Sequence, residues 1–291
     1  MEQTLLLSGK EVSKYVYSGL RNKIDSLKIR NITPSLAVVL VGENPASKIY
    51  VNSKTKIFRD LGLHTKTVRL DIEISQDKLV DIISELNYNV DYHGILVQLP
   101  LPNHVDPNVI INSIAPEKDV DGFHPENAGL LSIGKPRFIP CTPKGIMRIL
   151  EYYNISLNGK HVVVLGRSNI VGRPISILTS LKSEFSNATT TLCHSGTKNI
   201  TKYTKNADVI IAALGIPYFL NTTMIKSGCV IIDVGINRID FDNEKGYKIV
   251  GDVDYNNVKN TASAITPVPG GVGPMTIAML VENTIEAASI K

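Results

Sequence analysis

The stretch of sequence that decides the fold is SLAVVLVGENPASKIYVNSKTKIFRDLG, residues 35–62. Its first seven residues, Ser35–Val41, form a nearly continuous apolar run, which is typical of a strand buried on both faces of a parallel sheet. A helix is predicted directly after it, with Asn44 as its N-cap, Pro45 in the first helical position and Gly62 just beyond its end. A buried strand that leads directly into a helix indicates an α/β fold.

The predicted helix carries one charge near the middle of its apolar face, Lys54. At about 100° per residue, Tyr50 lies one turn before Lys54 on the same face. An ammonium group on such a face loses hydration, which lowers its pKa, so Lys54 is a candidate proton-transfer group. The alternative is a lysine whose aliphatic stem covers the face while its amine reaches water.

The residues around this unit repeat the alternation of helix and strand. Ser8 and Glu11 form an S-x-x-E capping box ahead of a helix that is predicted to run to about Lys28. A strand over 66–70, a helix over 75–86 and a strand over 94–99 follow residues 35–62. We therefore expect an N-terminal α/β domain.

Polar residues follow the last of these strands. Gln98 lies at its carboxyl end, where open parallel sheets bind ligands, although a polar residue that only marks a strand end is the alternative. The next loop carries Asp119 and Asp121, followed by Gly122. These carboxylates suit either the N–H donors of a flat ring or a simple turn. A metal is not expected, because no further oxygen ligands cluster nearby.

A second strand–turn–helix unit is predicted in GKHVVVLGRSNIVGRP, residues 159–174, with a tight turn at Gly166 and a helix that opens at Gly172. Small residues there would let backbone N–H groups approach a pyrophosphate at the helix N-terminus. The spacing is not G-x-G-x-x-G, and an ordinary strand-to-helix turn is the alternative. A domain boundary is expected shortly before this unit, near residues 138–143, where Thr142 would cap a connecting helix.

The cofactor is predicted from the residues that follow these strands. The strand over 189–193 ends at His194-Ser195, without the Asp or Glu that usually binds the ribose hydroxyls of NAD. Arg167 and Ser195 suit a 2′-phosphate instead, so we predict NADP. Backbone near Ile236, after a later strand, would face the nicotinamide side.

Composition limits the class of protein. The chain has 291 residues, a length that suggests two domains, and a thinly spread net charge of +4, which does not indicate nucleic-acid binding. Its three cysteines contain no C-x-x-C pair, so neither a disulfide framework nor a zinc site is supported. The N-terminus does not resemble a signal peptide and no apolar stretch approaches a membrane span, so we expect a cytoplasmic protein without a membrane partner.

Six motifs together resemble the bifunctional methylenetetrahydrofolate dehydrogenase/methenyltetrahydrofolate cyclohydrolase family. They occur in this order: S-K-I-Y-V-x-x-K at 47–54, G-I-L-V-Q-L-P-L-P at 94–102, P-E-K-D-V-D-G-F at 116–123, F-I-P-C-T-P at 138–143, G-R-S-x-I-V-G-R-P at 166–174 and P-V-P-G-G-V-G-P-M-T at 267–276. The resemblance implies a folate-binding catalytic domain over residues 1–145, completed by a C-terminal helix over 273–291. It also implies a Rossmann-type NADP domain over 146–272, with the active-site cleft between the two.

The resemblance further implies two activities and a role for each matching residue. Methylenetetrahydrofolate would be oxidised with NADP, and the methenyl product would be hydrolysed to 10-formyltetrahydrofolate. Lys54 would transfer protons, Tyr50 would stack on the substrate and Gln98 would hold and tune Lys54. The remaining implied contacts are Asp121 to the pterin ring, Pro269, Gly270 and Gly271 to the folate, and Gly166, Arg167, Ser168, Ser195 and Ile236 to NADP.

Three further expectations complete the sequence analysis. The family is typically homodimeric. Residues 178–187 are longer and more polar than we expect between the phosphate-turn helix and the next strand, so they should lengthen that helix or its loop. The competing functions are another NAD(P)-dependent dehydrogenase, acting on a small amino or hydroxy acid, and a non-catalytic nucleotide-binding module.

Overall fold

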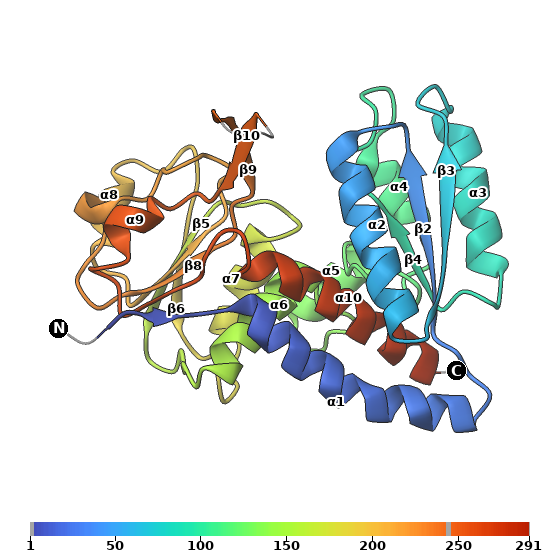
Figure 1. Cartoon of the computed structure of the whole chain (residues 1–291), viewed down its shortest axis with the longest axis horizontal. Coiled ribbons are helices and arrows are strands. Elements are labelled where there is room, and N and C mark those ends of the chain that lie inside the picture. The colour runs from blue at the N-terminus through green and yellow to red at the C-terminus, as the bar shows by residue number, and fades with distance from the viewer. Residues whose placement is uncertain (1–2, 243–245, 291) are drawn as a thin grey trace. The chain divides into compact units, whose positions relative to one another are not determined.

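The computed structural model describes residues 3–242 and 246–290. The chain divides into two compact units, one formed by Met1–Tyr15 with Thr142–Thr276 and the other by Val16–Cys141 with Ile277–Lys291. The helices α1 (Gly9–Ile29) and α10 (Val272–Ser289) each begin in the first of these units and end in the second (Figure 1). We call the unit that contains residues 16–141 the lysine unit and the other the turn unit.

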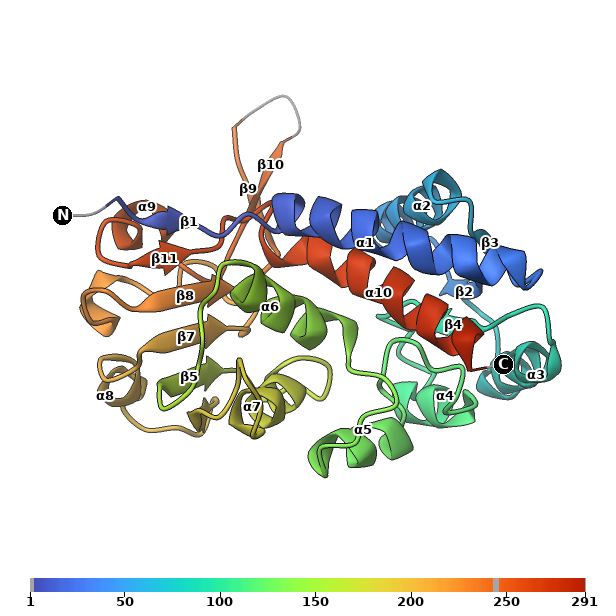
Figure 2. The ribbon, with the colours of Figure 1, turned by 90° about the horizontal axis from the view of Figure 1, so that it is seen from below.

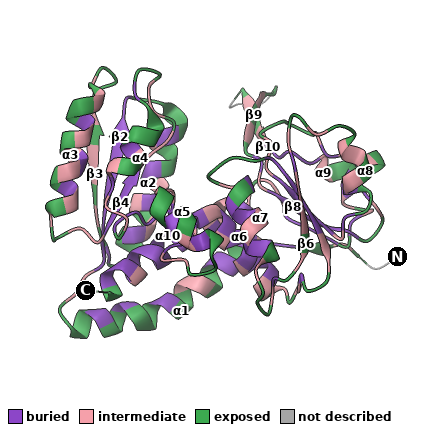
Figure 3. Ribbon diagram, turned by 180° about the vertical axis from the view of Figure 1, so that it is seen from behind, coloured by how far each residue is buried: buried purple, intermediate pink, exposed green. Residues whose placement is uncertain are grey.

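The lysine unit is built on a three-stranded parallel sheet in the order β3-β2-β4. Its strands are β2 (Ser35–Val41), β3 (His64–Leu70) and β4 (Gly94–Val97). All seven residues of β2 are buried, as the apolar run predicted (Figure 3). The strand expected over 94–99 ends at Val97, although the Gln98 N–H still donates to the carbonyl of Val39 at 2.9 Å.

Helices cover both faces of this sheet, with α2 and α3 on opposite sides (Figure 1). The core on the α3 side includes Ala37, Val39 and Val41 of β2 together with apolar residues of α3 and α4. The helices are α2 (Pro45–Asp60), α3 (Gln76–Tyr88), α4 (Pro107–Ser113) and α5 (Pro125–Ser132). The predicted helices correspond to α2 and α3, whereas the short helices α4 and α5 were not predicted.

The turn unit contains a six-stranded sheet in the order β1-β11-β8-β7-β5-β6, in which every pairing is parallel (Figure 2). Its strands are β1 (Leu5–Leu6), β5 (His161–Leu165), β6 (Thr189–Cys193), β7 (Val209–Ala212), β8 (Val230–Asp233) and β11 (Ala264–Ile265). A parallel sheet in each unit confirms the predicted two-domain α/β fold class. The N-terminal residues, expected with the folate domain, contribute the edge strand β1 to this sheet instead.

Short elements complete the turn unit. A two-stranded antiparallel hairpin, which was not predicted, projects after β8. The elements are α6 (Cys141–Tyr152), which starts one residue outside this unit, α7 (Gly172–Ser180), α8 (Ile200–Thr204), η1 (Thr222–Met224), β9 (Asn237–Asp240), β10 (Tyr247–Val250) and α9 (Tyr255–Val258).

Two local predictions need correction, and a third is narrowed to one of its two alternatives. Thr142 does not cap the connecting helix, because α6 already begins at Cys141, and its hydroxyl lies 3.0 Å from that of Thr276. Only half of the predicted capping box forms, since the Ser8 hydroxyl accepts from the Glu11 N–H while the Glu11 carboxylate accepts from two tyrosine hydroxyls. The extra length in 178–187 lies in a loop, because α7 ends at Ser180.

Candidate active site

Lys54 is held on the buried face of α2. The helix starts where predicted, with the Asn44 side chain accepting from the N–H groups of Ala46 and Ser47. Val51 lies one turn before Lys54 on this face and is buried, and Lys54 itself is only 8 % exposed. The alternative, an amine that reaches bulk water along the surface, does not describe this side chain.

Gln98 contacts Lys54 directly. The Lys54 amine donates to Oε1 of Gln98 at 3.0 Å. The Gln98 amide is fixed in that orientation because its Nε2 donates to the carbonyl of Leu99 at 2.7 Å. Gln98 therefore does more than mark a strand end, since its Oε1 accepts a hydrogen bond from the Lys54 amine.

Lys54 and Asp121 influence each other's ionisation. Burial lowers the pKa of the Lys54 amine, and the nearby Asp121 carboxylate partly opposes that shift. Burial likewise raises the pKa of Asp121, while Lys54 and a hydrogen bond from the Cys141 thiol oppose it. Each group is thus displaced toward its neutral form, which is the condition for exchanging a proton near neutral pH.

In the loop that carries Asp119 and Asp121, the two carboxylates differ in role, and only one of them serves the turn. Asp119 is structural, because its carboxylate accepts from the N–H of His124 at 2.7 Å and from the Asn127 side chain at 2.9 Å. Gly122 makes the turn, with a φ of +76° and an N–H that donates to the Asp119 carbonyl at 3.0 Å. The turn leaves Asp121, and not Asp119, beside Lys54.

Two buried residues of this site were not predicted. Cys141 is 1 % exposed, and its thiol contacts the carbonyl of Val120 at 3.5 Å. Asn283 of α10 donates from its Nδ2 to the carbonyls of Val120 at 2.8 Å and Ile139 at 3.0 Å, so it joins the Asp121 loop to the segment before Cys141. A lone Asn within the apolar sequence of the last helix was the available signal.

Tyr50 and the glycine-rich loop lie in different units. Tyr50, one turn before Lys54, is 37 % exposed, and burial of part of its ring raises the pKa of its hydroxyl. Pro269, Gly270 and Gly271 belong to the turn unit. There Gly270 has a φ of +108° and its carbonyl accepts from the Lys10 N–H at 3.1 Å, which fixes the loop against the start of α1.

The turn after β5 has the close backbone packing that was predicted for a phosphate site. A Cβ on Gly166 would lie 2.1 Å from the carbonyl oxygen of Ala213, and one on Gly172 would lie 2.0 Å from that of Gly166. Both positions therefore admit only glycine. The helix α7 begins at Gly172, so a turn with a glycine at each end leads into a helix N-terminus, which fits a pyrophosphate group.

The other predicted cofactor residues lie in this turn or follow strands of the same sheet. Arg167 and Ser195 are exposed, and each lies two residues beyond the paired strand residues Leu165 and Cys193. Ile236 is 49 % exposed after β8. Ser168 differs from expectation, because its hydroxyl accepts from the N–H groups of Val171 and Gly172 at 3.1 and 3.3 Å and thereby supports the turn itself.

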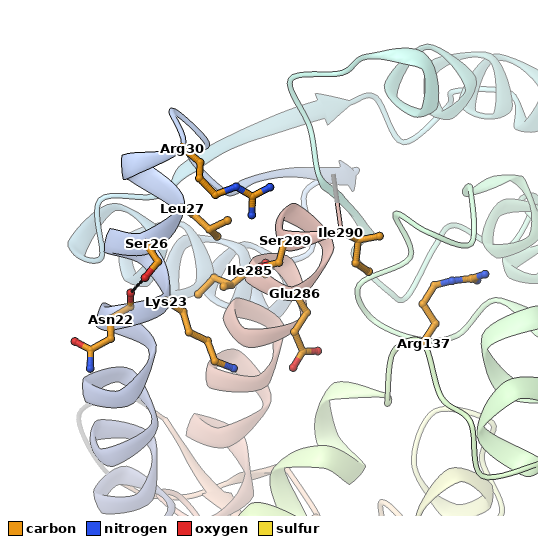
Figure 4. A pocket seen from close by; sticks show the side chains of 10 residues that line it. All are labelled: Asn22, Lys23, Ser26, Leu27, Arg30, Arg137, Ile285, Glu286, Ser289 and Ile290. Carbon is orange, nitrogen blue, oxygen red and sulfur yellow. Dashed lines mark hydrogen bonds between the residues drawn. The ribbon is translucent and has the colours of Figure 1, made fainter.

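A surface hollow of about 680 Å³ lies elsewhere, between the ends of α1 and α10 and beside Arg137 (Figure 4). None of the described residues that line it is a predicted site residue. Within residues 3–242 and 246–290, no group of three His, Cys, Asp or Glu side chains is placed to hold a metal ion. The helices in this same part of the chain include none that could span a membrane.

Comparison with known proteins matches both units to one family. The description "Tetrahydrofolate dehydrogenase/cyclohydrolase, catalytic domain" matches residues 7–121, and "Tetrahydrofolate dehydrogenase/cyclohydrolase, NAD(P)-binding domain" matches residues 140–291. The bifunctional protein FolD of Chlamydia muridarum is 49 % identical over 284 residues, which cover 97 % of this chain and 98 % of the relative.

Solved structures give the same result. The FolD methylenetetrahydrofolate dehydrogenase/cyclohydrolase of Campylobacter jejuni superposes with a TM-score of 0.93 at 47 % identity, covering 99 % of both chains. The Trypanosoma brucei dehydrogenase-cyclohydrolase, complexed with NADP cofactor and an inhibitor, has a TM-score of 0.94 at 34 % identity and covers 100 % of this chain and 99 % of its own.

Proposed function

This chain belongs to the tetrahydrofolate dehydrogenase/cyclohydrolase family, and from that membership we propose how its residues carry out two consecutive reactions. It is a bifunctional, NADP-dependent enzyme of one-carbon metabolism. The first reaction oxidises 5,10-methylenetetrahydrofolate to the 5,10-methenyl cation. The second hydrolyses that cation to 10-formyltetrahydrofolate.

The oxidation makes modest demands on the side chains. The methylene carbon lies between two nitrogen atoms whose lone pairs stabilise the cation, so no strong protein base is needed. NADP supplies the chemistry by accepting the hydride. The protein therefore has to hold methylenetetrahydrofolate and NADP in the correct relative position, and it need not supply an acid or a base for this step.

The hydrolysis requires a group that moves protons, and Lys54 has the required properties. A neutral Lys54 amine takes a proton from the water that adds to the methenyl carbon. The bond from that carbon to N5 then breaks, and the resulting Lys54 ammonium returns a proton to N5. One proton of the water thus ends on N5 and the other is released, which balances the reaction.

Three neighbours of Lys54 take supporting roles in this proposal. Gln98 holds the amine through the 3.0 Å hydrogen bond and keeps it oriented during both proton transfers. Asp121 accepts hydrogen bonds from the N–H groups of the pterin ring, and its charge tunes Lys54. Tyr50, partly exposed one turn away, stacks on the flat substrate. The single observation that supports the proposal most strongly is the burial of Lys54 against Gln98.

The turn unit would bind the remaining groups. Gly166 and the N-terminus of α7 receive the pyrophosphate, while Arg167 and Ser195 bind the 2′-phosphate that distinguishes NADP from NAD. Ser168 acts by supporting the turn. Ile236 lies against the nicotinamide. Pro269, Gly270 and Gly271 present backbone to the folate.

Domain boundaries, assembly and location are also proposals. We assign folate binding to residues 16–145 with the helix over 273–291, and NADP binding to residues 146–272 together with the N-terminal residues that supply β1. A homodimer formed mainly through the NADP domain and a cytoplasmic location follow from the family that the motifs resemble. Light scattering of the purified chain would test the dimer.

One assay tests the function. The purified chain is mixed with methylenetetrahydrofolate and either NADP or NAD, and both reduced nicotinamide and methenyltetrahydrofolate are followed with time. We expect reduced nicotinamide to form faster with NADP, and the methenyl absorbance to rise and then fall as it is hydrolysed. Binding of NADP without turnover, or faster oxidation of a small amino or hydroxy acid, would contradict the proposal.

A further inference from the structure

Asp252, which follows β10 in the turn unit, has no exposed surface and collects four hydrogen bonds. Its Oδ2 accepts from the N–H groups of Leu214 at 2.6 Å and Gly215 at 2.9 Å. Its Oδ1 accepts from the N–H of Ile216 at 3.0 Å and from the side-chain amide of Asn237 at 2.8 Å. One carboxylate therefore holds three consecutive backbone groups of the loop after β7 and a side chain that follows β8.

A second buried carboxylate holds Asp252 itself in place. Asp233, at the end of β8, accepts from the backbone N–H groups of Asp252 at 2.9 Å and Val253 at 3.1 Å, and also from that of Gly235 at 2.9 Å. The two aspartates form a chain of hydrogen bonds that joins the segments after β7, β8 and β10. All three segments meet near the carboxyl edge of the six-stranded sheet.

Two glycines show how closely this arrangement is packed. A Cβ on Gly251 would lie 1.8 Å from the Asp233 carboxylate, and a Cβ on Gly235 would lie 2.3 Å from the Asp252 carboxylate. Any other residue at either position would displace a carboxylate from its donors. The glycines at these positions therefore serve the aspartates, not a turn, since neither has a positive φ.

The loop held by Asp252 begins directly against the phosphate turn. The carbonyl oxygen of Ala213, the residue before Leu214, lies so close to Gly166 that a Cβ there would clash with it. The Ala213 N–H donates to the carbonyl of Leu165 at 2.8 Å. Asn237, the fourth partner of Asp252, directly follows Ile236 in the sequence. Asp252 thus lies between the two backbone segments that flank the site proposed for NADP.

We infer that Asp252 is a positioning residue for the dinucleotide, which holds the loop Leu214–Ile216 as one wall of the NADP site without touching the cofactor. The inference rests on the proposed NADP site in the turn unit. Because the carboxylate already accepts from three consecutive N–H groups, these groups are not available to bind a phosphate. The phosphates are left to Gly166 and the N-terminus of α7.

The test compares Asp252→Asn with Asp254→Asn, a matched control that removes a nearby charge whose described partner is only Asn257. NADP affinity is measured by titration, and hydrolysis is measured with methenyltetrahydrofolate supplied directly, so that no cofactor is needed. We expect Asp252→Asn to weaken NADP at least about tenfold with hydrolysis near the wild-type rate. Hydrogen exchange of residues 214–216 should become faster in this variant, and saturating NADP should slow it again. The control should behave as wild type in all three measurements.

The outcomes separate the two proposals. A wild-type chain that does not bind NADP refutes the proposed function itself. Wild-type affinity and wild-type exchange in Asp252→Asn refute only the positioning role. If that variant does not fold, Asn237→Ala, which removes one of the four donors, decides the matter: it should weaken NADP by a smaller factor, and unchanged affinity in a folded Asn237→Ala chain overturns the inference.

Discussion

The amine of Lys54 lies 3.0 Å from Oε1 of Gln98, although the two residues are 44 positions apart in the chain. A buried helix face and the carboxyl end of a neighbouring strand bring them together. Because the side-chain amide of Gln98 is itself fixed by the carbonyl of Leu99, the acceptor cannot turn away. This contact fixes the position of the buried amine to which we assign the proton transfers of the hydrolysis.

Replacement of Gln98 by Glu tests that contact. A carboxylate beside the Lys54 amine stabilises the ammonium form and raises the pKa of Lys54. We expect hydrolysis at pH 7 to fall by roughly tenfold or more, since less of the neutral amine is present. The activity should recover as the pH is raised. Gln98→Met, which removes the acceptor without adding charge, is the control, and identical pH profiles for the two variants would argue against the electrostatic explanation.

Replacement of Arg167 by Ala tests the choice of cofactor. Loss of a charge-assisted contact to the 2′-phosphate should weaken NADP by about 10- to 100-fold while affecting NAD much less. The matched control is Lys182→Ala, because Lys182 is also an exposed cation but lies beyond the end of α7. Titration with both dinucleotides measures the effect. Equal weakening of NADP and NAD would mean that Arg167 does not contact the 2′-phosphate.

Asp233 gives the free energy of unfolding a specific pH dependence. Burial raises the pKa of its carboxyl from 3.8 to about 7, against the effect of three backbone hydrogen bonds. Between these values the folded chain holds a proton that the unfolded chain has released, so stability falls as the pH rises through this window. The full change is on the order of 4 kcal/mol.

Urea unfolding of the wild type and of Asp233→Asn from pH 4 to pH 7.5 checks this expectation. The asparagine does not titrate, so the stability of the wild type relative to the variant should decrease with rising pH. A difference that stays constant across the window would show that Asp233 is not protonated in the folded chain.

Asn283 is expected to stabilise the loop that carries Asp121. Asn283→Ala leaves the carbonyl of Ile139 without its described donor and that of Val120 with only the weak Cys141 thiol, which should cost about 2–3 kcal/mol in the free energy of unfolding. Hydrolysis should also slow, because Asp121 is no longer held beside Lys54. Ser289→Ala on the same helix removes only a bond to its own helix and serves as the control. Equal stability of the two variants would count against this role.

The features that could be predicted from the sequence are those that depend on residues close together in the chain. The unit of β2 and α2 was predictable because its strand is apolar throughout and its helix has marked ends, both of which are local properties. The glycine turn after β5 was predictable for the same reason. The resemblance carried by the motifs then predicted Lys54, Tyr50, Gln98 and Asp121 as one site, which no single pattern did.

The missed features depend on contacts between distant segments. Asn283 reaches a carbonyl 163 residues away, and Asp252 collects donors from the loop after β7 and from the first residue of β9. No local pattern indicates such partners. The helices α4 and α5 are only 7 and 8 residues long, too short for a helical period to stand out, although each has a capping residue followed by Pro.

The most direct test of the central claim is the Lys54→Met variant in the two-step assay, because methionine fills the same apolar face without an amine. We expect hydrolysis of methenyltetrahydrofolate to be abolished, while the variant folds and binds NADP as the wild type does. Methenyltetrahydrofolate should then accumulate whenever the dehydrogenase step runs. Hydrolysis at the wild-type rate in this folded variant would contradict the account.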